Sequence, residues 1–104
     1  MTQVIRRMEI NEGVKEYSGR AGAALIDVRS RQEYAEGHIH GSINIPFMDI
    51  PYADELLPDT DAPVYVYCVS GHRSAQAAAV LDQMGYTDII NIGGIEKYFG
   101  EIQK

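Results

Sequence analysis

Short apolar runs alternate with amphipathic segments along the whole chain, and turn residues separate them. The runs are rich in β-branched and aromatic residues, which favour strands. We expect a short first strand at 4–8 and further strands at 23–28, 43–46, 62–68 and 87–94. The segment 62–68, "APVYVYC", is apolar on both faces, which is typical of a strand buried inside a parallel sheet.

The segments between these runs carry helix signals. Ser30 followed by Glu33 is the pattern of a capping box, and Gly37 follows where that short helix should stop. The strongest helix pattern begins after the fourth run, with Ala77 and Leu81 on one apolar stripe. Predicted helices occupy 12–19 (capped by Asn11), 30–37, 49–57, 73–85 and 94–104.

Strands that alternate with helices through short connections predict an α/β fold, with a mainly parallel sheet of about five strands and helices on both faces. The chain of 104 residues fits one domain, 1–104. Ligands of such sheets bind beyond the carboxyl ends of the strands. Two of those ends carry reactive or charged residues: Asp27 and Arg29 after the second strand, and Cys68 at the end of the fourth.

Composition narrows the function classes. The net charge of −6 argues against nucleic-acid or anionic-membrane binding, so a site for an anionic substrate must create positive potential locally. No apolar run approaches the roughly 20 residues of a membrane span, and the start lacks the apolar core of a secretory signal. We therefore expect a cytoplasmic protein. Its single cysteine excludes an internal disulfide.

The stretch "CVSGHR", Cys68 to Arg73, has the chemistry of a reactive thiol site. A turn from a strand into a helix can point several backbone N–H groups at one spot, and the helix N-terminus adds partial positive charge. Gly71 removes a side chain from that turn, and Arg73 adds a full charge. A cysteine there should have a lowered pKa and react as a thiolate.

Three motifs resemble those of one family. "CVSGHRSAQAAAVLDQMGY" is similar to the active-site loop and helix of rhodanese-type sulfurtransferases, and "LIDVRSRQEYAEGHIHGSINIP" and "INIGGIEKY" resemble the family's other signatures in family order. The resemblance implies a rhodanese-like three-layer fold and transfer of sulfane sulfur through a persulfide on Cys68. It also implies a loop that binds substrate and persulfide: Val69, Ser70, Gly71, His72 and Arg73.

Two other functions remain open at this point. Phosphatases and arsenate reductases of the same fold family place five residues between Cys and Arg, whereas four lie between Cys68 and Arg73. The shorter loop suits one sulfur atom better than a tetrahedral oxyanion. The third reading is an interaction or regulatory module with incidental turnover, for which a reactive thiol is unnecessary.

Supporting roles follow from placement. Arg73 either touches the substrate anion or is held by Asp27, and we favour the brace because Arg pairs bidentately with carboxylates. Arg29 is expected to pair with Glu33 or Glu36.

His72 either adds charge near neutral pH or sets access to the loop. The histidines and Cys68 fit no usual zinc spacing, so we expect no metal and no cofactor. The expected partners are a small anionic sulfur donor and a thiol or protein acceptor. Gly93 and Gly94 are not part of a dinucleotide motif and should permit a tight turn.

Overall fold

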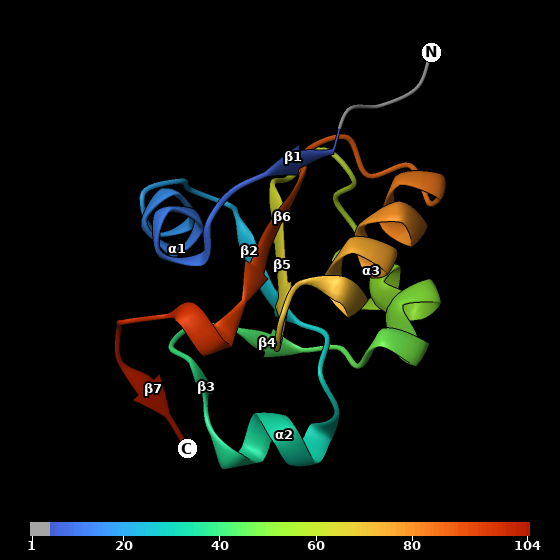
Figure 1. The fold of residues 1–104 in the computed structure, drawn as a ribbon. Helices are drawn as coiled ribbons and strands as arrows, with labels where there is room; N and C mark the ends of the chain where they lie inside the picture. Colours follow the sequence, from blue (N-terminus) through green and yellow to red (C-terminus); the bar gives the residue numbers. More distant parts are fainter. Residues whose placement is uncertain (1–4) are drawn as a thin grey trace.

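The protein is described by a computed structural model over residues 5–104 (Figure 1). Within this range none of the helices has the length and apolar character that crossing a bilayer requires. The elements, in chain order, are β1 (Arg6–Arg7), α1 (Ile10–Ser18), β2 (Ala24–Asp27), α2 (Arg31–Glu36), β3 (His38–Ile39), β4 (Ile43–Asn44), the 3₁₀ helix η1 (Phe47–Glu55), β5 (Val64–Cys68), α3 (His72–Gln83), β6 (Ile89–Gly94), the 3₁₀ helix η2 (Ile95–Lys97) and β7 (Ile102–Gln103).

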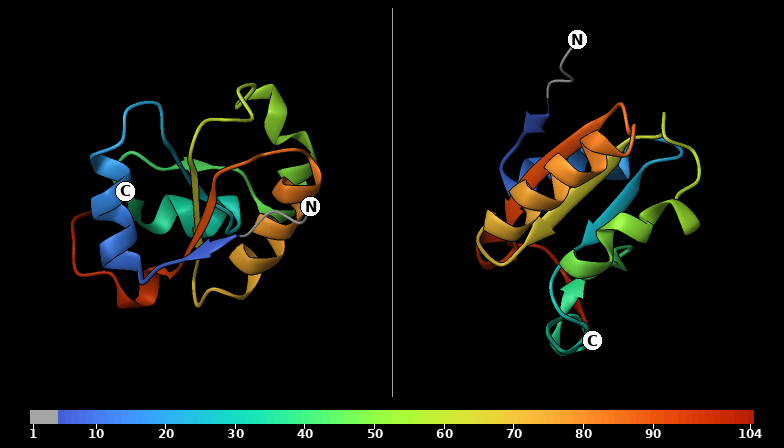
Figure 2. Two further views of the ribbon diagram at one scale, coloured as in Figure 1. Left: turned by 90° about the horizontal axis from the view of Figure 1, so that it is seen from above. Right: turned by 90° about the vertical axis from the view of Figure 1, so that its right-hand side faces the viewer.

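A five-stranded sheet in the order β1-β6-β5-β2-β4 forms the centre, and every neighbouring pair in it is parallel. Helix α1 covers one face, and α3 with η1 covers the other (Figures 1 and 2). Helix α2 lies beyond the carboxyl end of β2, at the edge of the sheet where β5 also ends (Figure 1). The predicted α/β architecture with helices on both faces is confirmed.

The two faces have separate apolar cores because side chains alternate along each strand. On β5, Val64, Val66 and Cys68 belong to the core beneath α3, whereas Tyr65 and Tyr67 belong to the core beneath α1. The period of two therefore places the cysteine side chain under the start of α3. The strand that fixes this position is fully buried.

The first helix is capped by a different residue from the one predicted. Asn11 lies inside α1, and the Glu9 carboxylate accepts hydrogen bonds from the backbone N–H groups of Asn11 and Glu12. The Asn11 side chain instead holds the C-terminal segment, donating to the Lys97 carbonyl at 2.9 Å and accepting from the Phe99 N–H at 2.9 Å.

The predicted helix at 94–104 is wrong, and its start is only the short η2. Asn11 occupies the backbone groups of Lys97 and Phe99, and Tyr98 is extended with ψ of 131°. The chain then forms β7, which pairs antiparallel with β3. The helix predicted at 49–57 is a 3₁₀ helix over 47–55, where Pro51 lacks the N–H that an α-helix would use. Val4 of the predicted first strand lies outside the described residues.

Candidate active site

Cys68 is the last residue of β5, and its side chain is 1% exposed. The pairing of β5 with β6 is irregular between Val66 and Cys68, where the ladder shifts so that Cys68 lies opposite Gly94. The chain then turns through 69–71 into α3. This turn covers the sulfur with backbone from the loop and from the first turn of the helix.

The Cys68 sulfur occupies the place of a helix cap. Gly71 is the N-cap residue of α3 and offers no side chain, so the orphan N–H groups of the first turn need another acceptor. The N–H of Gly71 donates to Cys68 Sγ at 3.0 Å, and that of Ser74 donates at 3.4 Å. Burial raises the pKa of the Cys68 thiol, but hydrogen bonds from Ser74, Gly71 and Ser70 outweigh it, so the pKa is lowered.

A buried polar chain, which sequence analysis did not single out, continues from the sulfur. Ser74 Oγ lies 3.5 Å from Cys68 Sγ and 2.7 Å from Asn91 Oδ1, and the N–H of Gly93 donates to the same Oδ1 at 3.0 Å. Ser74 is fully buried and Asn91 is 8% exposed. The only signal in the sequence was Asn91, a polar residue inside an otherwise apolar strand.

The loop packs directly against the end of β6. A Cβ added to Gly94 would lie 2.0 Å from the Val69 carbonyl oxygen and 2.7 Å from Ser70 Cα. Gly71 has φ of +103°, a conformation that only glycine adopts readily. Gly94 therefore makes room for the cysteine loop, a role beyond the turn predicted for it.

The expected pairing of Arg73 with Asp27 is wrong. Both terminal nitrogens of Arg73 bind the carboxylate of Glu33, at 2.9 and 3.1 Å. Glu33 also completes the predicted capping box with Ser30, accepting its N–H at 2.8 Å. One carboxylate thus caps the N-terminus of α2 and ties this helix to the first turn of α3. The hydrogen bond from Arg73 is the main cause that lowers the pKa of Glu33 to about 2.

Asp27 and Arg29 pair with each other, so the expected pairing of Arg29 with Glu33 or Glu36 is also wrong. Arg29 donates to Asp27 Oδ2 at 2.7 Å and to the Gly37 carbonyl at 2.6 Å, and its own N–H binds Asp27 Oδ1 at 2.9 Å. Both residues are buried. Asp27 lies only two residues from Arg29, within reach of its side chain, and a buried carboxylate needs a cation as partner. The pair braces the end of β2. Within residues 5–104 it makes no hydrogen bond or ion pair with Cys68.

Several cavities border the loop, and a small one of about 170 Å³ is lined by Ser70 with Glu9, Glu96 and Lys97. One of two larger cavities, of about 310 Å³, is lined by Ser70, Gly71 and His72 together with Arg7 from β1 and Asn91 from β6. Arg7 is exposed and has no ion pair within residues 5–104. Sequence analysis missed it, because only the fold brings β1 beside the loop.

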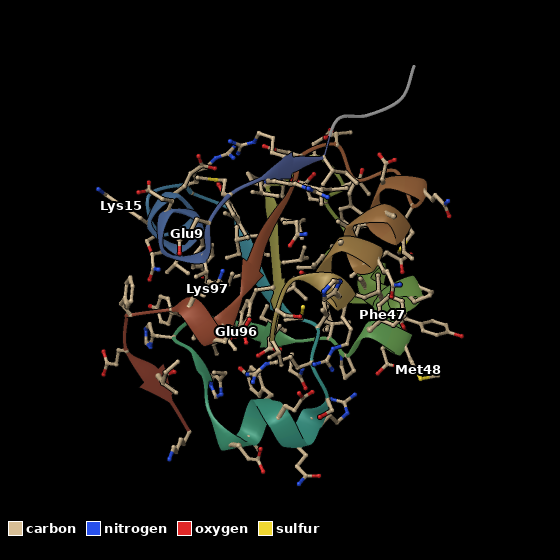
Figure 3. All side chains as sticks on the ribbon, in the orientation of Figure 1. Glu9, Lys15, Phe47, Met48, Glu96 and Lys97 are labelled. Atoms are coloured by element: carbon tan, nitrogen blue, oxygen red, sulfur yellow. The ribbon has the colours of Figure 1, made fainter. Side chains whose placement is uncertain are left out.

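The second cavity lies on the other side of the loop and is larger, about 540 Å³. Arg73 lines it together with Phe47 and Met48 of η1. Met48 is 84% exposed and points away from the body of the protein (Figure 3). The mouth of the site is therefore cationic on one side and largely apolar on the other. In the described part of the chain, no three His, Cys, Asp or Glu side chains gather as metal ligands would.

This fold, with a cysteine loop at the carboxyl edge of its parallel sheet, is that of the rhodaneses. The chain belongs to that family: residues 11–101 match the model of the rhodanese-like domain. A relative named thiosulfate sulfurtransferase PspE, from Escherichia coli, is 40% identical over 72 residues, which cover 68% of this chain and 69% of that protein. Thiosulfate sulfurtransferase GlpE of Pseudomonas fluorescens is 39% identical over 74 residues, covering 70% of this chain and 66% of the relative. These relatives support sulfurtransferase activity for this chain.

Solved structures agree. An E. coli rhodanese with anions aligns with a TM-score of 0.74 at 36% identity, over 79% of this chain and 98% of the other. The protein SSP1007 of Staphylococcus saprophyticus aligns with a TM-score of 0.79 at 30% identity, over 96% of this chain and 100% of the other. The fold predicted from the motifs is confirmed.

Gly94→Ala should disable the loop. The added methyl group meets backbone, which cannot rotate away, so we expect a loss of about 1–3 kcal/mol in the free energy of unfolding, as for other overpacked sites. Sulfurtransferase activity should fall with it. Gly19→Ala is the matched control, because its Cβ would make only ordinary contacts, the nearest at 3.7 Å. Denaturant unfolding gives the free energy of unfolding of both variants, and a turnover assay gives their activity. An active, fully stable Gly94→Ala protein would contradict the packing argument.

Glu33→Gln should destabilise the protein at neutral pH and progressively less in acid. The folded-state pKa of Glu33 lies below its ordinary value of 4.5, so its carboxylate stabilises the fold above pH 4.5, and this contribution disappears as pH falls toward 2. The pair is about one-third exposed, so we expect only about 0.5–1 kcal/mol at pH 7. Urea unfolding at pH 7, 4 and 3 measures the difference from wild type. Glu36→Gln on the same helix is the control, and an equal effect there would refute the assignment.

Proposed function

We propose that the protein is a thiosulfate:acceptor sulfurtransferase in which Cys68 carries sulfane sulfur as a persulfide. The Cys68 thiolate attacks the outer sulfur of thiosulfate and forms a new S–S bond. The S–S bond of thiosulfate breaks, and sulfite leaves with the electron pair. The negative charge then resides on the terminal sulfur of the persulfide, where loop N–H groups can stabilise it.

A nucleophilic acceptor completes the cycle. Cyanide or a thiolate attacks the terminal sulfur, the bond to Cys68 Sγ breaks, and the thiolate is regenerated. The chain has no second cysteine, so the acceptor is a small molecule or another protein. Sulfur passes through Cys68 alone, and the reaction requires no cofactor.

The observation that carries this proposal is the hydrogen bonding of Cys68 Sγ by the N–H groups of Gly71 and Ser74. These donors favour the thiolate, which is the nucleophile. Supporting it are the relatives named as thiosulfate sulfurtransferases.

Phosphatase chemistry is disfavoured by the four-residue interval and by Arg73, whose terminal nitrogens bind Glu33. We place the whole activity in one domain, 1–104, and in the cytoplasm, where a thiol stays reduced.

Cys68 should gain one sulfur atom on treatment with thiosulfate. We expect intact-mass spectrometry to show an increase of about 32 Da, one sulfur on a free thiol. Cyanide should remove the added mass and yield thiocyanate. Cys68→Ser should show neither the mass change nor turnover. The absence of any adduct on reduced wild-type protein would overturn the persulfide, and turnover of aryl phosphate or arsenate would favour the rival enzymes.

Arg7→Gln should weaken the use of thiosulfate by raising its KM. Arg7 and His72 line a cavity beside the loop, and a free cation there attracts a dianion toward an otherwise acidic protein. We expect a rise of roughly threefold to tenfold in KM, equivalent to about 1 kcal/mol, with kcat little changed.

Arg6→Gln is the matched control for this test, since Arg6 is one residue away and is paired with Glu16 at 2.6 Å. Added salt should narrow the gap between wild type and Arg7→Gln. Equal KM values for Arg7→Gln and Arg6→Gln would show that Arg7 has no part in donor binding.

A further inference from the structure

The hydroxyl of Ser74 has one proton and three acceptors around it. Asn91 Oδ1 lies 2.7 Å away, the Gly71 carbonyl 3.1 Å and Cys68 Sγ 3.5 Å. A hydroxyl donates one hydrogen bond at a time, so these acceptors compete. The shortest distance is to Asn91, which identifies the preferred acceptor while Cys68 is a thiol.

The orientation of the Asn91 amide is fixed by its second contact. The N–H of Gly93 can only donate, and it lies 3.0 Å from Oδ1, so this atom is the carbonyl oxygen. Asn91 also has its place fixed by the sheet, where it lies opposite Val66 of β5 and Arg7 of β1. Its oxygen is therefore a rigid acceptor aimed at Ser74.

The direction of hydrogen bonding must change with the charge on sulfur. As a thiol, Cys68 can donate its S–H to Ser74 Oγ while the Ser74 proton points to Asn91. When the S–H proton leaves for solvent, the thiolate is only an acceptor. The Ser74 hydroxyl then turns its proton to sulfur, and Asn91 Oδ1 retains the Gly93 N–H.

We propose that Asn91 is a positioning residue that competes with Cys68 for the Ser74 proton and so sets the balance between thiol and thiolate. Ser74 stabilises the thiolate, and Asn91 opposes it by holding the same proton. In the persulfide the charge moves to the outer sulfur, and the Ser74 proton returns to Asn91. The inference rests on the proposed function for its purpose, but its geometry concerns the free thiol alone.

Charged groups near the sulfur act on the same balance and stay constant in the test. The hydrogen bond with Glu33 is the main cause that raises the pKa of Arg73 of α3, and the charge of Cys68 contributes to the same rise. His72 lies in the loop, Glu33 of α2 holds Arg73, and Asp27 of β2 is held by Arg29. Arg7 of β1 lies opposite Asn91 and lines the cavity beside the loop, and Glu96 and Lys97 of η2 line another cavity with Ser70. The facing part of β6 contributes Asn91, which is uncharged. Substitution of Ser74 or Asn91 leaves all of these groups in place.

A double-mutant cycle tests the proposal. The chain has one cysteine, so the pH dependence of its alkylation by iodoacetamide reports the Cys68 pKa directly, without any sulfur donor. Ser74→Ala should raise this pKa and Asn91→Ala should lower it, each by roughly 0.5–1 pH unit, the size of one net hydrogen bond. In the Ser74→Ala background, Asn91→Ala should have no further effect, because Asn91 acts through Ser74.

Two results would overturn the inference: a rise in the pKa on Asn91→Ala, or an equal shift with and without Ser74. A purely structural role would change the melting temperature but would not give opposite pKa shifts. Asn91→Leu, which keeps the branched shape of the side chain without its polar atoms, repeats the test if the alanine variant unfolds.

The wild-type protein gives a measurement that needs no substitution. The side-chain amide resonances of Asn91 should shift in step with the thiol titration, and resonances that do not move would refute the proposal. If persulfide formation fails while the cycle holds, only the proposed function falls.

Discussion

The N-terminus of α3 is capped by the cysteine sulfur, and the rest of the site depends on this contact. Helices usually satisfy their first N–H groups with an oxygen from the N-cap side chain. Here the N-cap is Gly71, and the N–H of Ser74 donates to Cys68 Sγ instead. A negatively charged acceptor stabilises a helix N-terminus more than a neutral one does. The same hydrogen bonds therefore start the helix and stabilise the thiolate, so local folding and activation of the nucleophile share one cause.

Such a cap works only if strand, loop and helix hold their relative positions. On one side, the backbone of the loop rests on Gly94, where even a methyl group does not fit. On the other, Glu33 ties Arg73 in the first turn of α3 to α2. An arginine near a helix N-terminus is unfavourable for the dipole, and Glu33 compensates that charge. Protein groups alone thus fix the arrangement of the site, which is what electrostatic stabilisation of a developing charge requires.

Local rules predicted the elements well, and long-range pairing was harder. The capping box of Ser30 and Glu33 and the strand ending at Cys68 follow from spacing and side-chain type. The partner of Arg73 does not, because its choice between Asp27 and Glu33 depends on where α2 lies beyond the sheet. The last helix failed for a similar reason: Asn11, 86 residues away from Lys97, takes the backbone groups that helix would need. Arg7 and Asn91 enter the site only through strand order, which the sequence pattern leaves open.

An acidic chain with one buried thiol faces a conflict that the site resolves locally. The net charge of −6 opposes binding of the proposed anionic donor, and burial disfavours the thiolate. A formal cation next to the sulfur would attract the donor and stabilise the thiolate. It would also hold the negative charge on the cysteine sulfur. The Ser74 hydroxyl can instead reorient, and the N–H groups of the loop can stabilise a charge that moves outward by one sulfur atom. Neutral donors near the sulfur and cations at the mouth therefore suit the proposed persulfide cycle, in which the negative charge is gained, displaced and regained.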